Sequence, residues 1–172
     1  MKFERWLGAL LKQSEREVQL LLSDSAALQF LIAWSLFESK CFDGFVKIDR
    51  IQKFSERVAA EGCDPDSLDA ALAHLHQRYQ DKELYRQLMH GQVSSRMDSL
   101  LREPLSSFSG SGKIFFLSIV AYRYRNNMFH GNKGVQSWLA YAEQIRLCTI
   151  SIGHFVSHAE LRRPSLPERQ VA

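Results

Sequence analysis

The spacing of apolar side chains constrains the fold of this chain most, because it follows the period of an α-helix almost throughout. Within residues 3–22, apolar residues recur at steps of three and four, as one side of a helix requires: Trp6, Leu7, Leu10, Leu11, Val18 and Leu21. No segment alternates apolar and polar residues for the length of a strand. The sequence therefore predicts an all-α protein in which residues 3–22 form one amphipathic helix.

Capping residues, glycines and prolines divide the rest of the first hundred residues into further helices. Ser23 and Asp24 can cap a second helix, and Asp43-Gly44 ends it. Helical periodicity then continues through three more segments: 48–62, 64–79 and 82–102, the last broken near His90-Gly91. Trp34, Phe37 and Phe42 lie at helical spacing among leucines, so we expect them in the core.

The second half of the chain contains one clear loop and two long helices. The loop is Pro104–Gly112, and the helices run from about Lys113 to His130 and from Val135 to about Leu161. The sequence predicts a single domain over residues 1–161. Residues 162–172 carry two prolines and little that could pack, so we expect a disordered tail.

Charge and cysteine content favour a soluble cytoplasmic protein. A net charge of +3 is compatible with an anionic partner but argues for none by itself. The three cysteines are widely spaced and odd in number, which favours a reducing compartment over a disulfide framework. The sequence has no secretory signal pattern and no run of about 18 uncharged apolar residues, so no membrane association is expected.

Two short motifs resemble known sites but lack the residues that those sites need. "SGSGKI" has Ser107 and Ile114 where a phosphate-binding loop has glycine and Ser or Thr, so a helix connection is the better interpretation. His154 and His158 share a helix face, but Phe155 replaces the glutamate of the zinc-protease motif. No metal and no cofactor is predicted.

The stretch "YRYRNNMFHGNKG", residues 122–134, differs from the rest of the chain because it concentrates hydrogen-bonding groups. It holds two arginines, three asparagines and a histidine, and no acid occurs between residues 104 and 142. The arginines and Lys133 therefore create a local positive field. Two consecutive asparagines also lower helix propensity, so something other than helix formation favours them at this place.

Helix geometry brings several of these groups together. Asn126 and His130 are four residues apart and share a face, whereas Arg125 lies roughly 140° around the helix from His130. Gly131 is a natural helix stop, which presents His130 at the helix end beside solvent. An imidazole there can titrate near neutral pH and act as a general acid or base. The alternative to a functional site is an ordinary basic helix end, with an asparagine that caps the helix and a histidine that faces solvent.

The run Arg125-Asn126-Asn127-Met128-Phe129-His130 resembles the motif of the HEPN superfamily, in which arginine and a polar residue precede a histidine. The resemblance covers about Tyr122 to Lys133, and "WSLFESKCF" (residues 34–42) is weakly similar to an early helix of such proteins. It implies a HEPN-like helical bundle with the motif between two long C-terminal helices. It also implies a homodimer in which the motifs of two protomers face one cleft.

The resemblance further implies a metal-independent endoribonuclease. In this chain His130 would move a proton at the RNA 2′-hydroxyl or the leaving oxygen, and Arg125 would hold the scissile phosphate. Asn126 would orient His130 or a phosphate oxygen. With the 2′-hydroxyl as nucleophile, the enzyme would cut only RNA and leave a cyclic phosphate end.

The remaining polar residues of the motif would bind RNA in support of these three: Arg123, Asn127 and Lys133. Glu38 could pair with one of the motif arginines, or simply face solvent. Such nucleases are commonly toxins or antiviral defence effectors, so an antitoxin or another regulatory protein is an expected partner.

Two other functions fit the same residues. One is a non-catalytic HEPN-like module that binds nucleotide or RNA or scaffolds a partner. The other is a helical adaptor in which the motif is a coincidence. Loss of turnover with retained RNA binding in His130→Ala would identify the nuclease, whereas an adaptor would show no salt-dependent affinity for RNA.

Overall fold

The computed structural model describes residues 2–129 and 140–162, and within these ranges the chain is built from helices without any strand. The all-α class predicted from the apolar period is therefore confirmed. In chain order the helices are α1 Phe3–Leu11, α2 Glu15–Ser23, α3 Ala26–Cys41, α4 Ile48–Ala60, α5 Asp69–Tyr79, α6 Lys82–Met89, α7 Ser95–Arg102, α8 Gly110–Phe129 and α10 Ala142–Leu161. Two 3-10 turns, Asp66–Leu68 and Leu105–Ser107, precede α5 and α8.

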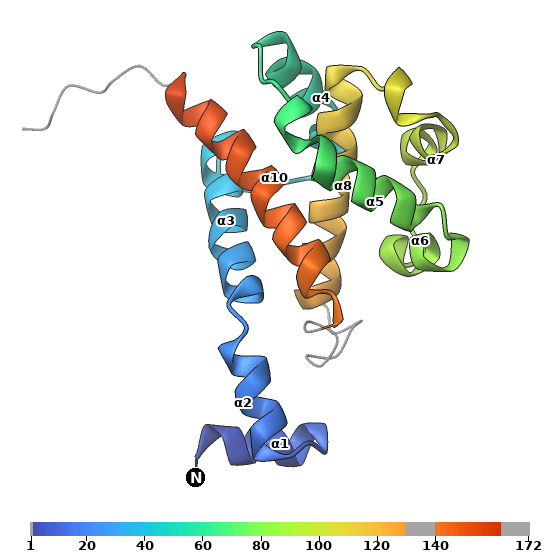
Figure 1. Ribbon diagram of the computed structural model, residues 1–172. Helices are drawn as coiled ribbons and strands as arrows, with labels where there is room; N and C mark the ends of the chain where they lie inside the picture. Colours follow the sequence, from blue (N-terminus) through green and yellow to red (C-terminus); the bar gives the residue numbers. More distant parts are fainter. Residues whose placement is uncertain (1, 130–139, 163–172) are drawn as a thin grey trace, which may run out of the picture.

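The core lies where α3, α4 and α10 meet α8. Figure 1 shows α10 crossing in front of α8 and running alongside α3, with α5, α6 and α7 on the other side of α8. Aromatic rings fill the interior, and Phe37 alone has the rings of Trp34, Phe42 and Phe54 within 5.0–5.5 Å between centroids. The prediction that Trp34, Phe37 and Phe42 belong to the core is confirmed.

The prediction of one continuous helix over residues 3–22 is wrong. Helix α1 ends at Leu11, and Lys12 takes a left-handed conformation with φ of 54°. Ser14 then starts α2 with a capping box: its hydroxyl accepts from the Glu17 N–H at 3.3 Å, and the Glu17 carboxylate accepts from the Ser14 N–H at 2.8 Å. This local pair of hydrogen bonds prevails over the continuous apolar period.

Helices α1 and α2 form an N-terminal arm (residues 3–23) that extends beyond the end of α3 in Figure 1. Asp24 joins the arm to the bundle. Its carboxylate accepts from the Ala26 N–H at 2.7 Å and pairs with Arg146 of α10 at 3.2 Å. The start of α3 is thereby fixed against α10. The N-cap of α3 is Ser25, one residue after the predicted Ser23 and Asp24.

Other predicted helix ends are confirmed at residues with positive φ. Asp43 and Gly44 terminate α3 with φ of 56° and 103°, and His90 and Gly91 separate α6 from α7 with φ of 50° and 78°. The predicted loop Pro104–Gly112 is shorter than expected. The reason is that Ser109 accepts from the Gly112 N–H at 3.1 Å and so caps α8, whose first turn contains the glycines of "SGSGKI".

The segment Glu15–Cys41 is, within the described residues, the one part of the chain that is long and apolar enough to cross a membrane. It is a weak candidate, because Asp24 and Ser25 divide it into two helices and its inner face packs in the core. This is consistent with a soluble protein, and cytoplasmic location stays a prediction. The predicted helix start at Val135 and the tail from residue 163 lie outside the described residues.

Candidate functional site

The last turns of α8 direct the motif side chains toward different neighbours. Arg123 and Asn127, four residues apart, face α6. Arg125 instead lies over Trp34 of α3. Tyr124, between the two arginines, contacts Tyr79 of α5. The structure therefore divides the residues that the sequence grouped into one motif.

The polar side chains on the face of α8 that contacts α6 are buried, and main-chain carbonyls accept their hydrogen bonds. Arg123 is 6% exposed and donates through Nη2 to the Met89 carbonyl and through Nε to the Leu88 carbonyl at 3.5 Å. Asn127 is 4% exposed and donates to the same Leu88 carbonyl at 3.1 Å. These carbonyls lie in the last turn of α6, and that of Met89 also accepts from the Gln92 N–H at 3.0 Å.

This arrangement bears on two of the three residues predicted to bind RNA, Arg123 and Asn127. Burial lowers the pKa of Arg123, because the charged form loses its hydration. The structure places the donors of Arg123 and Asn127 against the end of α6, inside the protein. Their RNA contacts stay a prediction, and the contacts present here fasten the motif helix to α6.

Toward α3, two of the three predicted catalytic residues of α8 form a hydrogen bond with each other. Arg125 and Asn126 are both half-buried, and Nη1 of Arg125 donates to Oδ1 of Asn126 at 3.1 Å. The Arg125 guanidinium lies over the indole of Trp34, with its carbon 6.0 Å from the ring centroid. A hydrogen bond and a cation–π contact thus orient the guanidinium from two sides.

Two residues of the predicted site, His130 and Lys133, lie outside the described residues, as does the predicted helix stop at Gly131. Helix α8 is described up to Phe129, directly before His130. The predicted proximity of His130 to Arg125 and Asn126 therefore stays a prediction.

Glu38 does not pair with an arginine of the motif within the described residues. Its carboxylate accepts from the Val46 N–H at 3.3 Å, and its carbonyl accepts from the Gly44 N–H at 2.8 Å. It holds the loop that follows α3. This contact differs from both alternatives that the sequence left open, because the side chain is half-buried and bonded to main chain.

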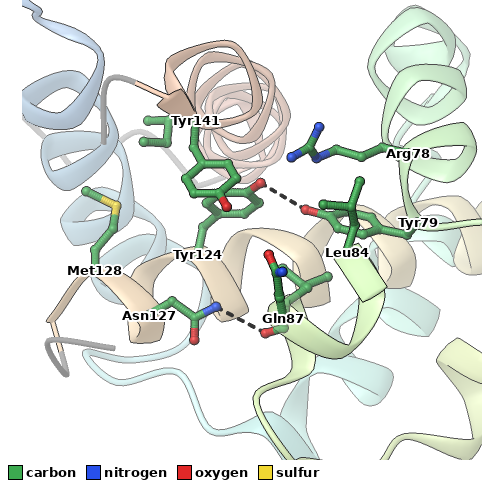
Figure 2. Close-up of a pocket in the computed structure, with 10 residues that line it drawn as sticks. Arg78, Tyr79, Leu84, Gln87, Tyr124, Asn127, Met128 and Tyr141 are labelled. Carbon is green, nitrogen blue, oxygen red and sulfur yellow. Dashed lines mark hydrogen bonds between the residues drawn. The ribbon is translucent and has the colours of Figure 1, made fainter. Parts of the chain in front are cut away.

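A pocket lies beside Asn127 and contains residues that the sequence did not single out as a site. Figure 2 shows Tyr79, Tyr124 and Tyr141 converging on it from three helices or their ends. The Tyr79 hydroxyl donates to that of Tyr124 at 2.9 Å, and the Arg78 guanidinium lies 5.6 Å from the centre of the Tyr141 ring. The sequence places Tyr79 at the end of the predicted helix 64–79, but nothing in the sequence shows that these rings meet.

Two of these tyrosines, Tyr79 and Tyr124, are held in their neutral form. Burial raises the pKa of Tyr79 well above its ordinary value, and the neighbouring Tyr124 raises it further. Burial likewise raises the pKa of Tyr124. Two hydroxyl groups that share one hydrogen bond at neutral pH can lock α5 to α8, but they supply no base.

The histidines of "HFVSH" take part in packing contacts. His154 lies with Nδ1 3.4 Å from the Ser67 hydroxyl, and His158 lies with Nε2 4.0 Å from the Glu61 carboxylate. Burial lowers the pKa of His158. Within residues 2–129 and 140–162, no group of three or more His, Cys, Asp or Glu side chains is placed to hold a metal ion.

Chemically, the described part of the site is an oriented cation with a neighbouring amide at the end of a helix. A guanidinium presented in this way suits a phosphate or another oxyanion. Comparison of the chain with family models, with characterised proteins and with solved structures found no match.

Proposed function

We propose that the chain is a metal-independent endoribonuclease that acts as a homodimer, with Arg125, Asn126 and His130 as its catalytic residues. The observation that supports this most is the pairing of Arg125 with Asn126 over Trp34, a few residues before His130 in the sequence. The resemblance of residues 125–130 to the HEPN motif supplies the reaction.

The proposed roles follow from the chemistry of each group. The oriented guanidinium of Arg125 binds the scissile phosphate and stabilises the negative charge that develops on its oxygens. His130 acts as general base or acid in the attack of the 2′-hydroxyl oxygen on phosphorus. The bond to the 5′ oxygen breaks, that oxygen receives a proton, and a 2′,3′-cyclic phosphate remains. Asn126 orients Arg125.

The other residues of the motif support this centre. Arg123 and Asn127 position the last turns of α8 through the carbonyls of Leu88 and Met89. Lys133 contacts the RNA backbone, whose phosphates attract the positive field of this acid-poor stretch. In the cell the chain serves as a toxin or antiviral defence effector in the cytoplasm, restrained by an antitoxin or another regulatory protein. This biological assignment rests on the resemblance alone.

The test is cleavage of total RNA by purified protein in EDTA. We expect cleavage by the wild type and a loss on the order of 10²-fold or more in His130→Ala and Arg125→Ala. Arg102→Ala is the matched control, because Arg102 is an exposed arginine at the end of α7. RNA binding by every variant, measured by anisotropy, separates turnover from affinity.

Three results would overturn the proposal. Equal cleavage by wild type and His130→Ala would place the activity elsewhere. RNA binding without cleavage by the wild type, tested on single- and double-stranded substrates, would favour the binding module. Absence of both cleavage and salt-dependent binding would favour the adaptor.

A further inference from the structure

The N-terminal quarter of the chain exposes an unusual number of large apolar side chains. Eight of them in residues 3–36 are 41–62% exposed: Phe3, Trp6, Leu10, Leu20, Leu22, Leu28, Ile32 and Leu36. Monomeric soluble proteins rarely expose apolar patches of more than a few hundred Å². At their observed exposures these eight side chains present roughly 800 Å² per copy, about what each partner contributes to an interface of standard size.

The outer face of α3 carries no charge over three turns. Its exposed residues are Leu28, Gln29, Ile32, Ser35, Leu36 and Ser39. A helix face in contact with water normally carries charged residues opposite its buried stripe. Of the most apolar 18-residue stretch within Glu15–Cys41, only 28% is buried, although the inner face of α3 lies in the core. The outer face of α3 therefore has the composition of an interface.

The N-terminal arm carries a second apolar stripe. Phe3, Trp6 and Leu10 recur on α1 at steps of three and four, and the rings of Phe3 and Trp6 lie 5.4 Å apart. Helices α1 and α2 have nine residues each, and isolated helices shorter than about 12 residues are marginal in water. The arm buries little of its own: Gly8, Val18 and Leu21.

We propose that a second copy of this chain covers both stripes, with the arm of each protomer lying on the outer face of α3 of its partner. The two stripes match in length, since Phe3 to Leu10 spans roughly 10 Å and Leu28 to Leu36 roughly 12 Å of helix. In Figure 1 the arm extends beyond the end of its own α3, away from the rest of the bundle. A two-fold axis generates the same contact twice, which closes the dimer.

The charges of the arm distinguish this occupant from a lipid surface. Helices that bind anionic membranes concentrate Lys and Arg on their polar side. Here acids and bases alternate instead, as in Glu4 and Arg5 and again in Glu15, Arg16 and Glu17. The apolar stripe of the arm therefore lacks the flanking cations that would bind anionic headgroups. The uncharged outer face of α3 is a better partner for this stripe.

The interface and the candidate site lie on different sides of α3. Ile32 and Leu36 are each two residues from Trp34, about 200° around the helix, whereas the Trp34 ring is buried beneath Arg125. A dimer is also part of the proposed function, but association is measured without RNA, so the failure of one proposal does not decide the other.

The experiment is sedimentation equilibrium of the full chain and two double variants. The arm variant carries Trp6→Glu and Leu10→Glu, and the stripe variant carries Ile32→Glu and Leu36→Glu. We expect a wild-type dimer and at least a 10-fold weaker association of each variant. Val93→Glu is the matched control, because Val93 is an exposed apolar residue in the loop between α6 and α7. Circular dichroism verifies that every variant keeps its helices.

Mixing the two variants tests the mode of docking. In the mixed dimer one arm-on-α3 contact combines both altered surfaces, while the other contact is entirely wild type. We therefore expect the mixture to associate more tightly than either variant alone. Contact of α3 with α3 would give no such rescue and would overturn the proposed mode.

Two further results would overturn the interface itself. The first is a wild type that stays monomeric at about 50 µM. The second is flotation of the monomer with phosphatidylcholine–phosphatidylserine vesicles, lost in the arm variant, which would assign the stripe to a membrane.

Discussion

Two pairs of identical residue types lie side by side at the end of α8 and have different surroundings. Arg123 and Asn127 are buried and donate to carbonyls at the end of α6, whereas Arg125 and Asn126 are half-buried and bonded to each other over Trp34. A step of two residues rotates a helix position by about 200°, so Arg123 and Arg125 face opposite neighbours. Position around the helix, and not residue type, separates a donor that holds the fold from one that can meet a ligand.

The largest effect expected from this contrast is on stability at Arg123. Arg123→Met removes one charged donor from each of the Leu88 and Met89 carbonyls, which keep only the Asn127 amide and the Gln92 N–H. We expect a loss of about 3 kcal/mol in the free energy of unfolding, against less than about 1 kcal/mol for Arg125→Met. Urea unfolding followed by circular dichroism measures both. Equal losses would remove the distinction between the two arginines.

The converse expectation concerns activity at Arg125. Arg125→Lys keeps the charge but loses the planar fork that bonds Asn126 and stacks on Trp34. Under the proposed function, RNA cleavage falls on the order of 10²-fold while stability changes by less than about 1 kcal/mol. Cleavage rates beside those of Arg102→Lys provide the comparison. Unchanged cleavage would show that only the charge matters, or that Arg125 does not act on phosphate.

The two asparagines repeat the contrast on a smaller scale. Asn127→Ala leaves the Leu88 carbonyl with one donor fewer, and we expect a loss of about 1–2 kcal/mol. Asn126→Ala removes a half-buried bond and should cost less than about 1 kcal/mol. The midpoints of thermal unfolding should therefore differ in the same order. A larger loss for Asn126 would contradict the description of these two faces.

The smallest expected effect concerns Tyr79. Its hydroxyl donates to Tyr124, which lies between the two arginines on α8. Because burial raises the pKa of Tyr79 above its unfolded value, its contribution to stability is full below about pH 10 and declines as the pH rises further. At pH 10.5 this costs about 1 kcal/mol for Tyr79. Stability measured between pH 8 and 10.5 should fall less steeply in Tyr79→Phe. Equal slopes would mean that Tyr79 titrates normally in the folded state.

Much of the fold could be predicted because its helices obey local rules. The apolar period and positive-φ positions such as Asp43-Gly44 and His90-Gly91 located most helices and their ends. The break at Lys12 was missed, although Ser14 and Glu17 have capping-box spacing, because the period continues through it. A short capping motif is easily overlooked when the longer apolar pattern continues through it without interruption.

The candidate site could be predicted only in part, because it depends on what packs against α8. The sequence identified the polar stretch but could not show that α6 presents its last carbonyls to Arg123 and Asn127. Nor could it show that Trp34, nearly a hundred residues earlier, lies beneath Arg125. Such contacts follow from tertiary packing, which a local pattern does not encode.

The packing of α3 on α10 has a consequence for how the chain is made. The Cys41 thiol donates to the Phe155 carbonyl and Arg146 pairs with Asp24, so these two helices meet across more than a hundred residues of sequence. At a synthesis rate of roughly 5–20 residues per second, α3 waits about 5–20 s for α10 to follow it from the ribosome. During that interval Phe30, Trp34 and Phe37 lack the helix that covers them, which makes the nascent α3 a natural ligand for chaperones.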